Sequence, residues 1–192
     1  MKYNPLIILS VLVVFIVLEN LFPLRKRRDH IRRIFHNFSL AVLALPITRL
    51  LTLPLVLFVA HLVELRGWGI FNILKFNNTI HYLLGFLILD FTIYWWHVAN
   101  HKVRFFWRFH QVHHADRDMD ATTALRFHFG ELVLSAFVRC GLILVVGLKV
   151  ETILVFDLLV TSTTLFHHGN LKLPLWLENI LSLIIVMIKG QL

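Results

Sequence analysis

Residues 88–101 read ILDFTIYWWHVANH, a long apolar run that ends in two histidines four positions apart. A second histidine cluster, HQVHH, follows at residues 110–114. On a helix, positions i, i+3 and i+4 lie on one face, so each cluster directs its imidazoles toward a common point. Imidazole is a ligand that suits iron, zinc, copper and nickel. The pattern therefore predicts a metal site at the polar end of an apolar helix.

The composition of the whole chain indicates a membrane protein. Of its 192 residues 58% are hydrophobic and 16% are charged, and the mean hydropathy is +0.75, whereas soluble domains carry about 25% charged residues. A helix needs roughly 20 apolar residues to cross a bilayer. The stretches that approach this length are residues 5–18, 38–62, 80–96, 131–148 and 151–166. We therefore predict an all-α, multi-pass membrane protein with about four to five transmembrane helices and a cytoplasmic, histidine-rich cap.

A basic segment between the first two apolar runs sets the expected orientation. Its members are Arg25, Lys26, Arg27, Arg28, Arg32 and Arg33. A nucleic-acid patch would also be basic, but the flanking spans favour a cytoplasmic loop that follows the positive-inside rule, so no nucleic acid is expected as a partner. Because these residues follow the first apolar run, we favour a transmembrane helix there over a cleaved signal peptide. Counting spans from this loop puts residues 97–114 and 167–168 at one cytoplasmic face, and a bacterial inner membrane is the expected location.

Several polar residues lie inside the apolar runs, where ionisable groups are costly and often functional. Arg139 and Asp157 could pair across a helical hairpin that turns at residues 147–149. Asp90 precedes His97 by two helical turns and is a candidate hydrogen-bond partner of that imidazole. Cys140 is the chain's one cysteine, so we expect a packing role and no disulfide.

Other histidine chemistries fit the pattern less well. A zinc-protease helix carries HExxH with a glutamate as base, whereas Val98 follows His97 and neither cluster holds a glutamate. Interfacial histidines without a metal would seldom form two clusters at helical spacing. A haem-binding electron carrier is a weaker alternative, because a membrane haem usually takes one histidine from each of two helices.

The motifs resemble the fatty acid hydroxylase / sterol desaturase superfamily of membrane enzymes. The matching segments are DFTIYWWHVANH (90–101), FWRFHQVHHADRDMDATTALRFHFGE (106–131) and FHHGNLKLP (166–174). The resemblance implies a four-helix membrane oxidoreductase with a cytoplasmic cap and a non-haem centre of two iron ions on eight or more histidines. It further implies O2-dependent hydroxylation or desaturation of a lipid C–H bond, fatty acyl or sterol-like, with electrons from an external donor.

The resemblance also assigns site residues, position by position. The implied metal ligands are His97, His101, His110, His113, His114 and His168, together with His128 as a ligand or as the partner of one. The residues that would hold ligand imidazoles in place are Asp90, Asp116, Asp120 and Asn170. His167 matches no required position, and no catalytic residue beyond the metal ligands is implied.

The family pattern continues with one more HxxHH box, which is expected shortly after residues 166–174. No histidine follows His168 in this sequence. We therefore expect residues 80–192 to be a C-terminally incomplete hydroxylase-like domain, preceded by transmembrane helices and the basic loop in residues 1–79. Six to eight histidines would hold one metal ion well and two with difficulty. The alternative function is thus an inactive, truncated membrane remnant that binds at most one metal ion.

Overall fold

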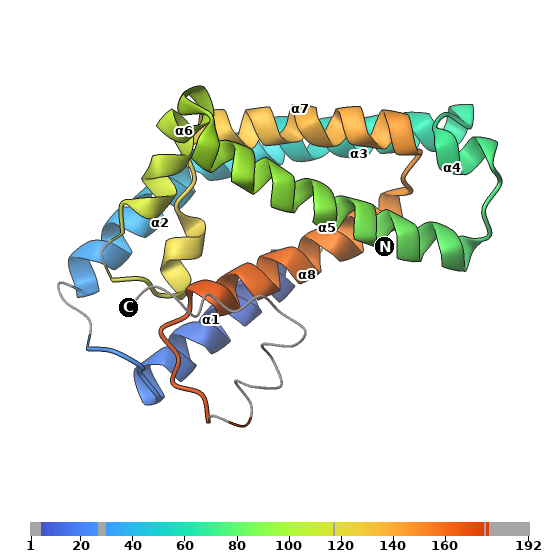
Figure 1. Cartoon of the computed structure of the whole chain (residues 1–192). Helices are drawn as coiled ribbons and strands as arrows, with labels where there is room; N and C mark the ends of the chain where they lie inside the picture. The colour runs from blue at the N-terminus through green and yellow to red at the C-terminus, as the bar shows by residue number, and fades with distance from the viewer. Residues whose placement is uncertain (1–4, 27–29, 117, 175, 177–192) are drawn as a thin grey trace.

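The computed structural model describes residues 5–26, 30–116, 118–174 and 176 (Figure 1), and among them it contains helices but no β-strand, only an isolated bridge between Pro23 and Leu171. The elements are α1 (Pro5–Leu21), α2 (His30–Ile47), the π-helical turn η1 (Thr48–Thr52), α3 (Leu53–Arg66), α4 (Ile70–Ile73), α5 (Asn78–Lys102), α6 (Arg104–His114), the 3-10 turn η2 (Ala121–Leu125), α7 (Phe129–Val146) and α8 (Val150–His168). The predicted all-α class is confirmed.

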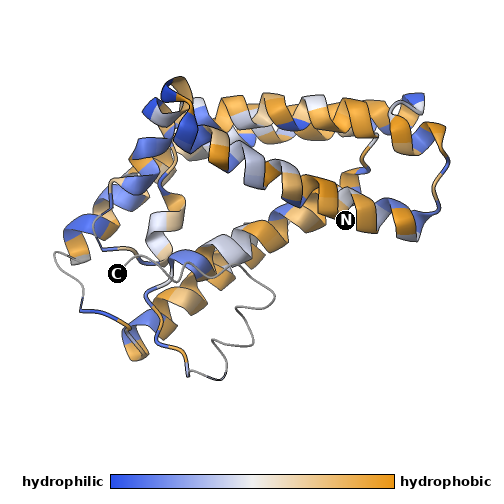
Figure 2. Ribbon diagram, viewed as in Figure 1, coloured by the Kyte–Doolittle hydropathy of each residue, from blue (hydrophilic) through white to orange (hydrophobic). Residues whose placement is uncertain are grey.

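Four helical stretches in the described part of the chain are long and apolar enough to cross a membrane. They are Ile31–Ile73, Asn78–Lys102, Phe129–Val146 and Val150–His168. Helix α1 is apolar but shorter, at 17 residues. Hydrophobic residues dominate the long helices in Figure 2, and hydrophilic ones gather toward the helix ends. Apolar side chains on the outside of a helix bundle suit a lipid surrounding, which agrees with the predicted multi-pass membrane protein.

The core between the long helices is filled by aliphatic and aromatic side chains. It joins α3, α5, α7 and α8 through Val63, Leu89, Ile143 and Phe156, each 1% exposed or less. Two expectations for the apolar runs are confirmed at its edge. Arg139 Nη2 lies 2.7 Å from Asp157 Oδ1, which joins α7 to α8 by an ion pair inside the span. Cys140 is buried with a free thiol.

The turns of the chain collect at two opposite ends of the bundle. At one end, on the right of Figure 1, the α7–α8 turn at Gly147 lies against Gly69, just before α4. Both glycines have positive φ, +87° and +91°, and a Cβ on Gly69 would collide with the Gly147 backbone. Such a close approach in left-handed conformation requires glycine at both positions.

The other end gathers α6, η2 and the last turn of α8 (Figure 1). There η2 contacts α1, α2 and α8, and α8 also contacts α1. Leu24 N donates to Asn170 O at 3.0 Å, and Asn37 Nδ2 donates to Thr122 Oγ1 at 2.8 Å. The span count from the sequence is therefore right in one respect: the histidines of residues 97–114 and those at the end of α8 lie at the same end of the bundle.

Candidate metal centre

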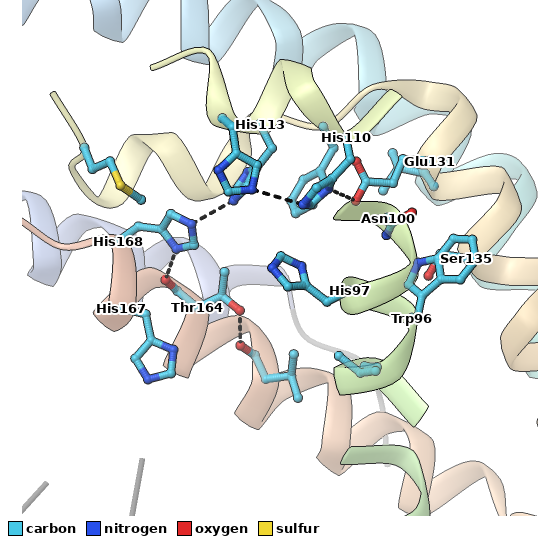
Figure 3. A pocket seen from close by; sticks show the side chains of 16 residues that line it. Trp96, His97, Asn100, His110, His113, Glu131, Ser135, Thr164, His167 and His168 are labelled. Carbon is cyan, nitrogen blue, oxygen red and sulfur yellow. Dashed lines mark hydrogen bonds and ion pairs between the residues drawn. The ribbon is translucent and has the colours of Figure 1, made fainter. Parts of the chain in front are cut away.

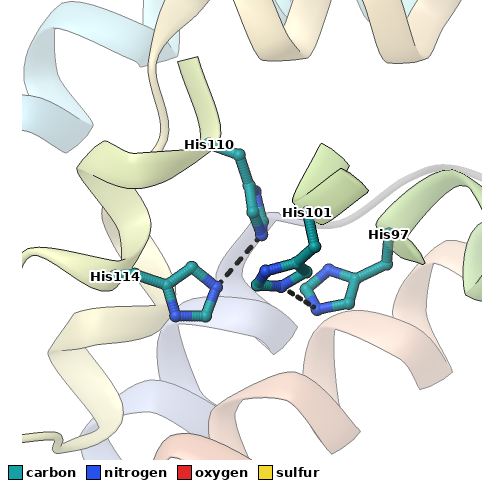
Figure 4. A group of neighbouring side chains, drawn as sticks. All are labelled: His97, His101, His110 and His114. Carbon is teal, nitrogen blue, oxygen red and sulfur yellow. Dashed lines mark hydrogen bonds between the residues drawn. The ribbon is translucent and has the colours of Figure 1, made fainter. Parts of the chain in front are cut away.

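Four histidines from two consecutive helices form the centre of the site (Figure 4). His97 and His101 lie on the last turns of α5, and His110 and His114 lie on α6. Val103, in extended conformation, is the only residue between the two helices, so α6 folds back beside the end of α5. The ligand atoms of the four side chains all lie within 4.8 Å of one another.

The spacing of these imidazole nitrogens fits a metal ion. His97 Nε2 lies 3.1 Å from His101 Nε2, and His110 Nε2 lies 3.1 Å from His114 Nε2. Nitrogen ligands about 2.1 Å from one ion are separated by roughly 3.0 Å at a right angle and roughly 3.4 Å in a tetrahedron. His110 is buried while the other three are exposed. The group thus has the donors and the separations for one ion, and an open side.

A second pair of imidazoles lies beside this group (Figure 3). His113 Nε2 is 2.8 Å from His168 Nε2, which brings α6 to the end of α8. The Nδ1 atoms face backbone carbonyls, that of Arg126 at 3.3 Å and that of Thr164 at 2.8 Å. A carbonyl oxygen only accepts, so both Nδ1 atoms carry the proton and the facing Nε2 atoms carry lone pairs. Two lone pairs in contact need a cation between them, and a metal ion satisfies this.

The protonation of the histidines outside the spans favours metal binding. Burial, reinforced by the positive charge that neighbouring histidines would carry, lowers the pKa of His113 to about 3. Partial burial of the His114 ring, and then the positive charge that His110 and His101 would carry, lower its pKa to about 4. Both rings are therefore neutral at pH 7. A neutral imidazole is the form that binds a metal ion.

Glu131, in the first turn of α7, holds His110 in place. Its Oε1 lies 2.8 Å from His110 Nδ1, and both side chains are buried. A carboxylate in this position fixes the tautomer that leaves Nε2 free for a metal and makes that nitrogen a better donor. Sequence reasoning did not select Glu131. The available signal was an acidic residue at the start of an apolar helix, which is costly without a partner.

His128 lies apart from both histidine groups. Its Nδ1 accepts a hydrogen bond from Gly130 N at 3.0 Å and thereby caps α7. Its ring contacts are Phe109, at 5.1 Å between centroids, and Phe129. The structure thus brings six of the seven predicted ligands together and gives His128 a capping contact instead.

Asp116 and Asp120 lie in a buried polar network with α2. Asp116 accepts hydrogen bonds from Arg33 at 2.7 and 3.0 Å, from Asn37 at 3.1 Å and from Thr123 at 2.7 Å. Asp120 caps η2 through Thr122 N and pairs with Arg33 at 3.3 Å. Burial opposes ionisation of Asp116, but the hydrogen bonds and charge of Arg33 outweigh it, so the pKa of Asp116 is lowered. The contacts seen for these two carboxylates are with α2 and η2.

The network reaches the histidines through Arg126. Its Nη1 donates to Asn37 Oδ1 at 3.0 Å and its Nε donates to Val112 O at 3.1 Å. The carbonyl of the same residue receives His113 Nδ1–H. The guanidinium therefore fixes the backbone that orients His113, and sequence spacing gave no sign of this role.

The two remaining predicted residues lie in different surroundings. Asn170 is buried after α8, where its side chain bonds both backbone groups of Arg25 at 3.0 and 2.8 Å. Its N–H donates to Glu19 Oε1 at 2.6 Å, and Ala121 N donates to the same oxygen at 2.8 Å. Asn170 thus anchors the segment that follows His168 to α1. Asp90 is exposed on α5, and we find no hydrogen bond from it to an imidazole in the described residues.

A cavity of about 400 Å³ adjoins the histidines (Figure 3). His97, His110 and His168 belong to its lining, and so do the apolar residues Ile93 of α5 and Val160 of α8. A cavity of this size is ordinary for a small-molecule site. An apolar space, lined in part by helices that would lie in the membrane, therefore lies directly beside nitrogen ligands.

Both histidine groups lie within a segment that matches a known family. Residues 82–188 match the fatty acid hydroxylase family model. Alkylglycerol monooxygenase from Xenopus tropicalis is 48% identical over 46 residues, which cover 24% of this chain and 10% of that protein. The human alkylglycerol monooxygenase is 36% identical over 61 residues, which cover 32% of this chain and 14% of that protein. The matched segments thus span a small part of these relatives. No solved structure matches the chain.

Proposed function

We propose that this chain, which belongs to the fatty acid hydroxylase family, is a membrane-bound non-haem iron oxygenase that hydroxylates or desaturates a lipid C–H bond with O2. The observation that carries the proposal is the convergence of six imidazoles beside an apolar cavity. Family membership supports lipid hydroxylation in general. That the metal is iron, that two ions bind and that the substrate is a fatty acyl or sterol-like lipid are parts of the proposal.

The proposed iron ions would use the two histidine groups separately. His97, His101, His110 and His114 would hold one ion, and His113 and His168 would contribute to the second. Bound iron supplies O2 activation, with electrons from an external donor. The chain's own part is to keep these imidazoles neutral by burial, as for His113 and His114. It also orients them through Glu131 and the backbone carbonyls.

The substrate would be a lipid that enters the cavity from the bilayer. Ile93, Leu132 and Val160 give this space an apolar wall that suits a fatty acyl or sterol-like chain. Burial of that chain would also keep water from the reacting C–H bond. Because relatives are alkylglycerol monooxygenases, alkylglycerols belong among the lipids to be tested.

The proposed location of the histidines is the cytoplasmic face. Arg25 and Lys26, which follow α1, lie at the same end of the bundle as the histidines, as do Arg32 and Arg33 in the first turn of α2. Clustered basic residues remain on the cytoplasmic side of a membrane. A soluble cytoplasmic reductant could then reach the site without crossing the bilayer.

Metal analysis of the detergent-purified chain tests the proposal. We expect up to two iron ions per chain, one held tightly by the four-histidine group and the second held weakly, because only His113 and His168 contribute to it. We also expect O2-dependent incorporation of 18O into a lipid if the reaction is hydroxylation. His114→Ala should remove iron from the four-histidine group, whereas His61→Ala, an exposed histidine on α3, should leave the iron content unchanged.

The iron count also separates the alternatives. One tightly held ion with no lipid product would favour a remnant that binds a single metal, and a protein that takes up no iron would overturn the proposal. His128→Ala should keep the full iron content, because its Nδ1 caps α7 instead of facing the other imidazoles.

A further inference from the structure

Glu131 has one carboxylate oxygen that the metal-centre contacts do not use. Its Oε1 accepts from His110 Nδ1, but its Oε2 is buried and has no hydrogen-bond partner among the described residues. The Glu131 side chain is 8% exposed. A buried acceptor without a donor is costly, and more so when it belongs to a charged group. Such an oxygen indicates that a donor other than the described residues completes it.

The surroundings of Glu131 locate that donor in the cavity. Glu131 is one of the residues that line it, together with Ser135, one turn further along α7, and Asn100 of α5, which is 2% exposed. Figure 3 shows the three polar side chains on the same side of the cavity, next to His110. Leu132 and Trp96 also belong to the lining. A small polar corner thus adjoins an apolar space and the four-histidine group.

We propose that Glu131 Oε2 accepts a hydrogen bond from a hydroxyl group of the lipid in the cavity. The substrate class would be long-chain lipids that carry a free alcohol, in preference to lipids of the same length whose oxygen is capped. This inference rests on the proposed function, since it assigns the substrate of the same site. Through His110, the residue that recognises the hydroxyl also orients a metal ligand.

The probes are two lipids of the same chain length, one with a free hydroxyl and one with that oxygen capped by a methyl group. 1-Hexadecanol carries an O–H, whereas its methyl ether keeps the oxygen and the chain but has no hydrogen to donate. We expect the purified full chain to bind the alcohol about tenfold more tightly, which is the size of one hydrogen bond to a charged acceptor. Competition of each probe against tritiated hexadecanol in a scintillation proximity assay measures the ratio.

Glu131→Gln tests the residue itself. The amide oxygen can still accept from His110, while the amide N–H groups would face the cavity as donors. A donor binds the alcohol and the ether oxygen alike, so the tenfold preference should fall to about one, with the ether still bound. Glu151→Gln is the matched control, because Glu151 is an exposed carboxylate at the far end of α8 and its loss should preserve the tenfold preference.

Equal affinity of the wild-type chain for alcohol and ether would overturn the inference, since water would then serve Oε2 equally well. Persistence of the preference in Glu131→Gln would overturn it too. If that variant does not fold, the wild-type comparison decides alone. Lipid discrimination by a chain that takes up no iron would support this inference while rejecting the oxygenase. A chain that binds iron and oxidises a lipid, but binds the alcohol and the ether equally well, would support the oxygenase and reject this inference.

Discussion

Asp116 joins three parts of the site through a single buried carboxylate, and its ionisation should control acid stability. Arg33, Asn37 and Thr123 all donate to it, and its pKa lies below the usual 3.8. A group whose folded pKa is depressed contributes stability above its unfolded pKa and loses it as the pH falls through the folded value. The melting temperature of the purified chain should therefore drop below about pH 4.

Asp116→Asn separates this effect from general acid damage. Loss of the charge should destabilise the chain at pH 7 by about 1.5–3 kcal/mol, the value of hydrogen bonds to a charged group. The fall in melting temperature below about pH 4 should be shallower in the variant. An identical pH profile for both proteins, measured by thermal denaturation in detergent, would assign the acid sensitivity to other groups.

Residues that share a helix face could be predicted from the sequence, and residues that meet across the fold could not. The spacing of His97 with His101, and of His110 with His114, is visible within five letters and needs only helical geometry. Glu131 meets His110 across 21 positions, and Arg126 meets Asn37 across 89. These contacts depend on how the helices are packed, which local spacing does not contain.

Among the elements, the α7–α8 turn depends on Gly147. A Cβ there would lie 2.7 Å from Trp68 O, and φ is +87°, where side chains are strained. Gly147→Ala should lower the free energy of unfolding by about 2–4 kcal/mol, because left-handed strain adds to a backbone clash. Denaturant titration in detergent measures the change, and we expect the hairpin to separate from the α4 region first.

Gly141→Ala is the matched control on the same helix. Nothing lies within 4 Å of the added Cβ, and the residue is in the helical interior of α7. Alanine should be neutral or stabilise the helix by about 0.5–1 kcal/mol, since it reduces the flexibility of the unfolded chain. Equal losses at both glycines would contradict the packing of the turn against Gly69.

The apolar runs located the helices but not their ends. The predicted span 80–96 lies inside α5, which begins at Asn78 after a side-chain cap from Asn77 and continues through the histidines to Lys102. The run 38–62 lies within a helical stretch from α2 to α3, with the π-turn η1 directly after Pro46. Hydropathy reports the part of a helix in contact with lipid, whereas caps and polar contacts set where the helix stops.

At the scale of the whole molecule, helices from outside the family match complete the site. The match begins at residue 82, yet Glu19 of α1 holds both Ala121 and the segment after His168, and Arg33 of α2 holds Asp116. The N-terminal helices thus fix the two segments that carry His113 and His168. The histidine end of the bundle therefore depends both on the N-terminal helices and on the segment that matches the family.

The histidine end of the bundle faces one side of the membrane, and single cysteines can reveal which side it is. In a Cys140→Ala background, Gln111→Cys would place a thiol on the exposed side of α6, at the histidine end, and Arg66→Cys would place one at the opposite end of α3. Basic residues near α1 and α2 predict a cytoplasmic histidine end. In intact cells a membrane-impermeant maleimide should label the Arg66→Cys protein at once and the Gln111→Cys protein only after permeabilisation. The opposite pattern would put the imidazoles on the outer face, where a cytoplasmic electron donor could not reach them, and would remove the reductant from the proposed reaction.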